Sequence, residues 1–331
     1  MLTRTFLKVV SVLSFSLLFS RGLLSQEADM GLYRSHPLAV NPSYTGDFNG
    51  DWRLALGYRS QQVLTADPYK TAVAAFDGHF YIRNQQFGAG VYVMNDVSGI
   101  GGLTYNTIHA SLAYSKEIAN HYFGLGIQGG FVSATVNDWN NWNDRNGDFS
   151  LPSGESFDNA AYPDINIGIS WRHKTKNLMP RAGFSLAHIN KPDKFFYDDS
   201  EKLGMRMLAD IGLTYDLNDK LMITPQILAN LGGGINKTIT GLDLSWEFKG
   251  SKPVRRIFGG VYLNNGIIEK TSSVMLNLGA QVKRIEVSLG YEQRMGLFGE
   301  ATGTTGAFEI ALVYKSISTY LNTYSIPCER F

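Results

Sequence analysis

The stretch LGMRMLADIGLTYDL, residues 203–217, carries the pattern that decides the fold. Its alternate residues, from Leu203 to Leu217, are all apolar or aromatic, while Arg206 and Asp210 fall in the positions between them. A period of two places these sets on opposite faces of a β-strand, whereas a helix would mix them on every face. Leu208 is the single exception on the polar face. We therefore predict a strand here.

The same alternation recurs along the chain. It is clear at 52–60, 163–172 and 285–292, and weaker at 71–82, 87–96, 104–115, 122–136, 181–189, 221–231, 236–248, 255–264, 272–282 and 305–315. Strands of about 9–12 residues match a bilayer, whereas strands of soluble sandwiches are nearer 5–6 residues. Charges on the second face are costly in a dry core, but they can pair or meet water in a lumen. We predict an all-β, transmembrane antiparallel up-and-down β-barrel of about fourteen strands.

The N-terminal residues predict export. Arg4 and Lys8 precede an apolar stretch over residues 9–19, the pattern of a secretory signal peptide, with cleavage after Gly22 or Ser25 left open. We assign residues 1–25 to the signal peptide, 26–50 to an N-terminal periplasmic or plug segment, 51–315 to the barrel and 316–331 to a C-terminal tail. The expected location is the cell outer membrane.

The net charge and the lengths of the loops limit which partners we expect. A net charge of +1 provides no field for nucleic acid, so we expect none. If the chain starts in the periplasm, the long segments 137–162, 190–202 and 295–304 face outside, as in other barrels. We expect these loops to contact a partner protein through their aromatic residues: Trp139, Trp142, Phe195, Phe196 and Phe298.

No residue pattern predicts catalysis, a cofactor or a firm metal site. Asp144, Asn146, Asp148 and Glu155 echo a calcium loop, but Phe149 stands where the turn needs glycine, which favours a solvated loop. His79 with Asp77, and His109 with Ser111, each face inward on one strand, yet no nucleophile elbow or metal motif accompanies them. We predict a non-enzymatic protein.

The interior of the barrel is open to two interpretations. Inward charges either line a conduction path or lock a filled lumen through ion pairs; they are Arg53, Arg59, Asp164, Arg172, Arg206, Asp210, Glu286, Glu292 and Arg294. Fourteen strands lie between packed eight-stranded and open sixteen-stranded barrels, which favours a plugged or occupied interior. The box NPSYTG, residues 41–46, is either a fixed turn that packs the N-terminal segment against the barrel or an ordinary periplasmic turn.

Six short motifs, in order, resemble those of the PorP/SprF family. They are NPSYTG with Asn41, Pro42, Tyr44 and Gly46; YRSQ with Arg59; ND with Asp96; PDINIG with Pro163 and Asp164; HINKP with Pro192; and the terminal CERF with Cys328, Arg330 and Phe331. Ser43, Thr45, Ile165 and Glu329 depart from the family pattern. The motifs span nearly the whole mature chain.

The resemblance implies an outer-membrane component of the type IX secretion system that helps to secrete or anchor large surface proteins such as gliding adhesins. Its implied partners are membrane lipid, a secreted substrate bound through a C-terminal sorting domain, and other secretion components on the periplasmic side. The alternative is an outer-membrane porin or a transporter of hydrophobic ligands.

Overall fold

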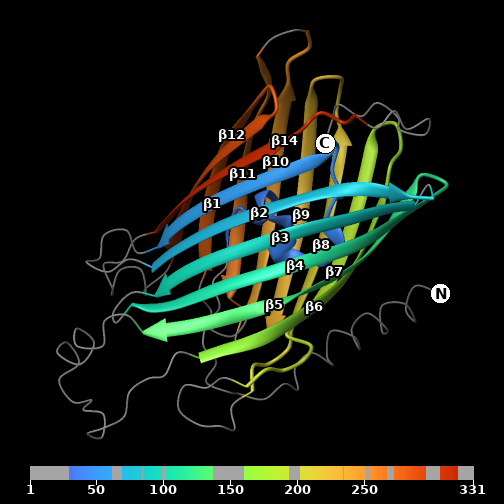
Figure 1. Cartoon of the computed structure of the whole chain (residues 1–331). Coiled ribbons are helices and arrows are strands. Elements are labelled where there is room, and N and C mark those ends of the chain that lie inside the picture. The colour runs from blue at the N-terminus through green and yellow to red at the C-terminus, as the bar shows by residue number, and fades with distance from the viewer. Residues whose placement is uncertain are drawn as a thin grey trace, which may run out of the picture.

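The described residues form a closed barrel of antiparallel strands (Figure 1). The computed structural model describes residues 30–61, 69–83, 85–98, 102–136, 160–193, 202–233, 235–250, 253–266, 272–295 and 306–319. Each strand pairs with its neighbours in the chain, and β1 closes the barrel on β14. The all-β barrel and its fourteen strands, predicted from the alternation, are confirmed. In the part of the chain that the structure describes, no helix is long and apolar enough to cross a membrane.

The strands are nine to sixteen residues long. Their bounds are β1 Trp52–Gln61, β2 Tyr69–Ile82, β3 Gln85–Ser98, β4 Leu103–Ile118, β5 His121–Val136, β6 Ala160–His173, β7 Leu178–Ala187, β8 Arg206–Asp216, β9 Leu221–Gly232, β10 Ile235–Glu247, β11 Val254–Gly266, β12 Ser272–Val282, β13 Ile285–Met295 and β14 Ala307–Lys315.

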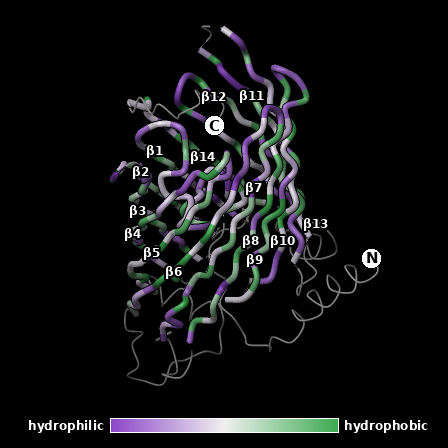
Figure 2. The backbone as a smooth tube through the Cα atoms, turned by 90° about the vertical axis from the view of Figure 1, so that its right-hand side faces the viewer, coloured by the Kyte–Doolittle hydropathy of each residue, from purple (hydrophilic) through white to green (hydrophobic). Residues whose placement is uncertain are grey.

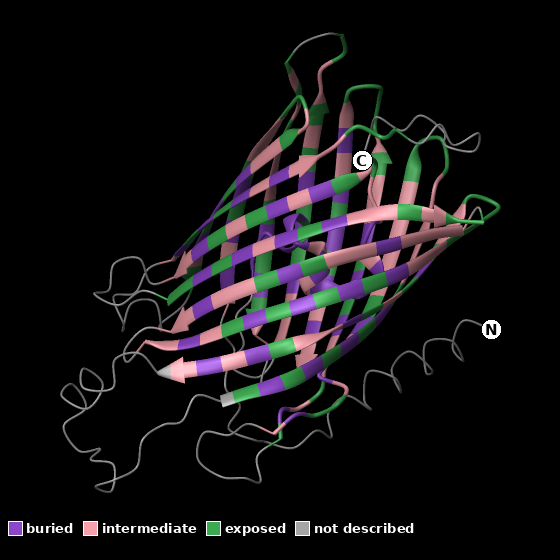
Figure 3. Ribbon diagram, in the orientation of Figure 1, coloured by how far each residue is buried: buried purple, intermediate pink, exposed green. Residues whose placement is uncertain are grey.

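Side chains alternate between the two faces of the wall. On β4, Ile108 and Leu112 are 54% and 60% exposed on the outer face, whereas Thr107, His109 and Ser111 are buried inside. Figure 3 shows the same banding along the other strands, and Figure 2 shows green and purple residues alternating along the tube. So many large apolar side chains on the outer surface require lipid rather than water around them.

The segment that predicted the fold is confirmed as a strand, with one correction. Ile211 is 65% exposed on the outer face, and Asp210 is buried inside. Leu203, predicted on the outer face, lies before β8 begins at Arg206 and is buried with Val132 and Tyr162. Leu203 therefore belongs to the interior of the barrel.

The two ends of the barrel differ in the length of their connections. Turns after even-numbered strands occupy 83–84, 119–120, 174–177, 217–220, 248–253 and 283–284, and we call this the short-turn end. Connections after odd-numbered strands occupy 62–68, 99–102, 137–159, 188–205, 233–234, 267–271 and 296–306, which is the long-loop end. Both termini of the wall lie at the short-turn end, where Asp51 N donates to Ser316 Oγ at 3.0 Å.

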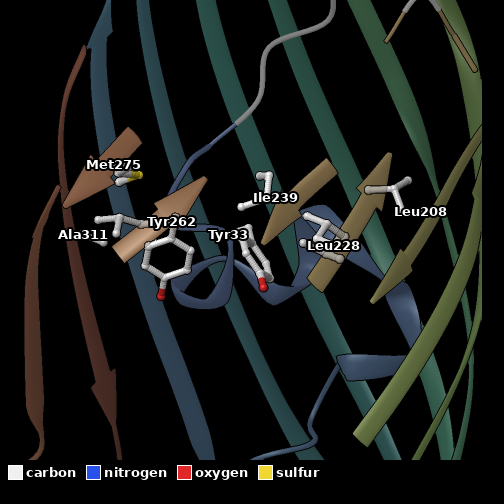
Figure 4. Packing of buried hydrophobic residues seen from close by; sticks show 9 residues of the cluster. Tyr33, Leu208, Leu228, Ile239, Tyr262, Met275 and Ala311 are labelled. Atoms are coloured by element: carbon white, nitrogen blue, oxygen red, sulfur yellow. The ribbon is translucent and has the colours of Figure 1, made fainter. Parts of the chain in front are cut away.

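The lumen holds residues 30–50, which we call the plug segment (Figure 1, blue). It contains three short turns of helix, η2 Tyr33–Ser35, α2 Pro37–Val40 and η3 Pro42–Tyr44. Tyr33 packs among side chains of β9, β10 and β11, as Figure 4 shows, and Leu208, the exception on its strand, joins the same cluster. A second cluster joins Leu38 to the wall. Among the described residues, two of the three apolar clusters therefore lie between plug and wall, and the third surrounds Leu203.

Candidate functional site

The box at residues 41–46 lies inside the lumen and bonds to the wall. Asn41 is extended, as a residue before proline prefers, and its Oδ1 accepts a hydrogen bond from Ser43 N at 2.9 Å, which caps η3. Its Nδ2 donates to the backbone oxygens of Ile169 and Phe184 at 2.9 and 3.3 Å. One asparagine therefore shapes the turn and attaches it to β6 and β7.

The rest of the box is held by strands on either side of β6 and β7. Tyr44 Oη donates to Asp210 Oδ1 at 2.8 Å, and Thr45 Oγ1 donates to Ser111 Oγ at 2.9 Å. Gly46 N donates to Asp77 Oδ2 at 2.8 Å, and Gly46 has a φ of 71°, which favours glycine. The box thus forms hydrogen bonds with side chains of β2, β4 and β8.

The start of the plug segment is held by one buried carboxylate. Glu309 on β14 accepts hydrogen bonds from Gly31 N at 2.8 Å and Leu32 N at 2.9 Å. Its charge is balanced by Arg59 Nη1 at 2.9 Å, and Arg59 also pairs with Glu292. Glu309 is 0% exposed, so its three donors replace water entirely.

Glycines of the wall let the plug backbone approach closely. A Cβ at Gly126 would lie 2.3 Å from the backbone of Pro42, and one at Gly168 would lie 2.0 Å from Asn41 Oδ1. Any side chain at either position would push η3 away from the wall.

The residues weighed as catalytic candidates are engaged in structural contacts. Asp77 binds Arg53 at 2.7 Å as well as the box, and Ser111 accepts from Thr45. His79 packs edge-on against Phe48 at 5.8 Å. Through these contacts, Asp77, Ser111 and His79 each help to hold the plug.

A histidine–aspartate cluster lies nearer the long-loop end. Asp164 Oδ1 faces His188 Nδ1 at 2.7 Å, and its Oδ2 faces His109 Nε2 at 3.2 Å. Asp96 accepts from Thr71 Oγ1 at 2.6 Å. Among the described residues, no group of three His, Cys, Asp or Glu is arranged to hold a metal ion.

Two other motif prolines bear on the loop connections. The carbonyl oxygen of Pro163 accepts from Asn190 Nδ2 at 2.7 Å, and that of Pro192 accepts from Leu203 N at 2.8 Å. The first contact attaches the connection between β7 and β8 to β6, and the second closes that connection on itself.

Plug residues line two cavities, one towards each end of the barrel. Towards the long-loop end, a cavity of about 120 Å³ is lined by apolar side chains such as Met30, Tyr92 and Leu208, and by polar ones such as Asp164 and Arg206. Towards the short-turn end, a cavity of about 420 Å³, which we call the vestibule, is lined by charged side chains of plug and wall. The larger volume falls within the usual range of ligand sites.

Several predicted residues lie outside the described part of the chain. They are the signal peptide, Trp139, Trp142, Asp144, Asn146, Asp148, Glu155, Phe195, Phe196, Phe298, Cys328, Arg330 and Phe331. The proposed roles of these residues stay predictions.

Sequence reasoning missed several partners of the inward charges. The alternation identifies Arg59 and Glu292 as inward charges but does not draw attention to Glu309, and it suggests only a catalytic role for Asp77. Asp243, which binds Arg34 at 3.2 Å, was not singled out. The available signal was a lone acidic residue between small or apolar ones on an inward face, as at Glu309 between Ala307 and Ala311.

Solved structures with a similar fold are barrels. The CymD monoaromatic hydrocarbon channel aligns with a TM-score of 0.52 and 12% identity, over 90% of this chain and 95% of that one. The toluene transporter TodX of Pseudomonas putida aligns with a TM-score of 0.50 and 10% identity, over 88% and 94%. Identities this low show the fold alone. A search of curated proteins found no match.

The family comparison is more specific. A family model described as type IX secretion system membrane protein PorP/SprF matches residues 24–314, which includes the plug segment and almost the whole wall. This match confirms the resemblance drawn from the six motifs. The chain is thus an outer-membrane β-barrel and belongs to the PorP/SprF family of type IX secretion system membrane proteins.

Proposed function

We propose that this barrel acts as a plugged protein-binding component of the secretion system and not as an open pore. The observation that carries the proposal is the attachment of the plug segment to strands all around the wall, from Glu309 on β14 to Asp77 on β2 and Asp210 on β8. Buried charge-assisted hydrogen bonds are expensive to break, so the plug resists displacement.

The two ends of the barrel then have different partners. Short turns are typical of the periplasmic side of such barrels, so the vestibule faces the periplasm and the other secretion components. The segments 137–162, 190–202 and 295–304 face outside and contact the exported protein. The protein is non-enzymatic in this proposal, and its interior side chains serve to hold the plug.

Two measurements test the proposal. Purified protein in a planar bilayer should show no steady conductance, and affinity purification from native membranes should recover a secreted protein together with periplasmic components. Replacement of the three long segments by short turns should abolish recovery of the secreted protein while the barrel still folds. A steady open pore of nanosiemens scale in the unaltered protein would contradict the proposal.

A transporter of hydrophobic ligands is the second candidate, favoured by the predominantly apolar surface of the long-loop cavity. The similarly folded TodX is described as a toluene transporter. This candidate predicts that toluene enters liposomes faster when the protein is present. Equal entry with and without the protein would exclude it.

A further inference from the structure

The vestibule has a charge arrangement that the plug does not satisfy. Seven cationic and five carboxylate side chains line it. Asp77, just outside the lining, pairs with Arg53 and still leaves an excess of positive charge.

Two pairs of like charges lie directly opposite each other on neighbouring strands. Arg172 on β6 is in register with Arg181 on β7, and Arg53 on β1 is in register with Lys315 on β14. All four side chains line the vestibule. Opposed like charges on one face of a sheet destabilise it, because their Cβ atoms are only about 5 Å apart.

Each pair is compensated on one side alone. Arg172 binds Asp47 of the plug at 2.9 Å, and Arg53 binds Asp77 at 2.7 Å. Within the described residues, Arg181 and Lys315 form no ion pair, although Arg181 donates to Gln226 at 3.1 Å. Among the described residues, these two cations therefore lack a carboxylate at ion-pair distance, although Lys315 is also attracted by Glu286, which pairs with Arg256.

We propose that the vestibule binds a carboxylate-bearing peptide segment of a partner protein, with Arg181 and Lys315 as anion ligands. This inference rests on the proposed function, because it names the chemistry of a periplasmic partner. A guanidinium and an ammonium group both donate to carboxylate oxygens, and the guanidinium can do so with two parallel bonds.

The remaining lining favours a peptide over a small ion. Tyr81, Tyr122 and Phe258 add aromatic surface beside the cations. A cavity of about 420 Å³ holds several side chains, whereas an isolated small anion would fill only part of it. The partner segment is therefore both acidic and long enough to contact aromatic rings.

Binding of a fluorescein-labelled hexaglutamate peptide to the purified full-length protein in detergent, followed by anisotropy at low salt, tests the proposal. We expect saturable binding that weakens as salt rises. Arg181→Gln and Lys315→Gln should each weaken it about tenfold, since a hydrogen bond to a charged group is lost. Lys315→Arg, which keeps the charge, should restore it.

The controls separate the site from general attraction. Lys220→Gln removes a cation at the same end but outside the vestibule, and it should leave binding unchanged. A hexaglutamine peptide should not bind. Equal binding by wild type and both vestibule variants would overturn the proposal, and so would inorganic phosphate that binds as tightly as the peptide. Neither result bears on bilayer conductance or partner recovery, so the proposed function would stand or fall separately.

Discussion

The two halves of the lumen differ in how their charged side chains are paired. In the long-loop half, Arg59 is enclosed between Glu292 and Glu309, and every one of these groups is buried. In the short-turn half, Arg181 and Lys315 line an open vestibule and form no ion pair within the described residues. The buried network of Arg59, Glu292 and Glu309 holds the plug in place. In the vestibule, Arg181 and Lys315 are available to bind an anionic group. The plug is held in both halves, since Asp77 and Arg172 also bind it near the short-turn end, but only the short-turn half combines holding with the proposed recognition of a partner.

The largest effect should come from the closed half, at Glu309. Glu309→Gln keeps the volume but sets an amide against three donors, Gly31 N, Leu32 N and Arg59 Nη1. Breaking one partner of a buried charge network costs about 3–5 kcal/mol. We expect that loss in denaturant unfolding in detergent.

The exposed pair Lys249–Asp219 supplies the control for Glu309. Its side chains are 57% and 83% exposed, so Asp219→Asn should cost at most about 1 kcal/mol. Equal losses for Glu309→Gln and Asp219→Asn would show that Glu309 does not hold the plug.

The next effect depends on pH and on His36 in the plug. His36 is 0% exposed, and neither ring nitrogen has a hydrogen-bond partner among the described residues. Burial, together with the charge of Arg53, lowers the pKa of His36 to about 4 from 6.5. The released plug therefore binds more protons than the seated plug below pH 6.5. The stabilisation is present above that pH and is lost as pH falls towards 4, up to about 3 kcal/mol in all.

Protease cleavage of the plug from pH 7.5 to 4.5 measures this effect. An acid-active protease should cut the wild type faster as pH falls, after correction for its own pH profile. His36→Gln cannot gain a proton, so its cleavage should depend less on pH. Identical pH profiles for the two proteins would show that His36 is not responsible.

A smaller effect should come from wall glycines, where one strand supplies its own control. Gly126→Ala would place a Cβ 2.3 Å from the Pro42 backbone and should displace η3 at a cost of about 1–3 kcal/mol. Gly129→Ala, on the same strand β5, meets nothing nearer than 3.8 Å and should be close to neutral. Thermal unfolding in detergent measures both. A neutral Gly126→Ala would mean that the plug can shift freely.

The sequence predicted the wall better than the contents of the lumen. Alternation at 203–217 depends only on lipid outside and polar groups inside, so it is visible along a single strand. The contacts of the box are different, because Asn41 binds the backbone oxygens of Ile169 and Phe184. Every residue offers such an oxygen, so no side-chain pattern identifies those partners. The family motifs marked the box itself, but not the path of the plug.

Arg181 and Lys315 were hard to recognise as candidate anion ligands for a related reason. Arg172 was singled out as an inward charge, while Arg181 and Lys315 were not. Their significance depends on strand register, since only the pairing of Arg172 with Arg181 and of Arg53 with Lys315 brings like charges together. A shift of two residues along either strand, which keeps each side chain on its face, would have separated them, and the alternation alone does not exclude such a shift.

The smallest predicted change in stability distinguishes the two halves of the lumen most directly, because it is a gain, whereas the change in the closed half is a loss. Lys315→Gln relieves the repulsion from Arg53, Arg256 and Arg34 at the loss of the attraction to Glu286, and it breaks no ion pair among the described residues. The empty protein should therefore become more stable, by about 0.2–1 kcal/mol, whereas Glu309→Gln makes it less stable. Denaturant unfolding at low salt measures the gain, and salt should diminish it by screening the repulsion that the variant relieves. A loss of stability in Lys315→Gln would mean that this lysine holds the wall together, and the vestibule would then resemble the closed half of the lumen.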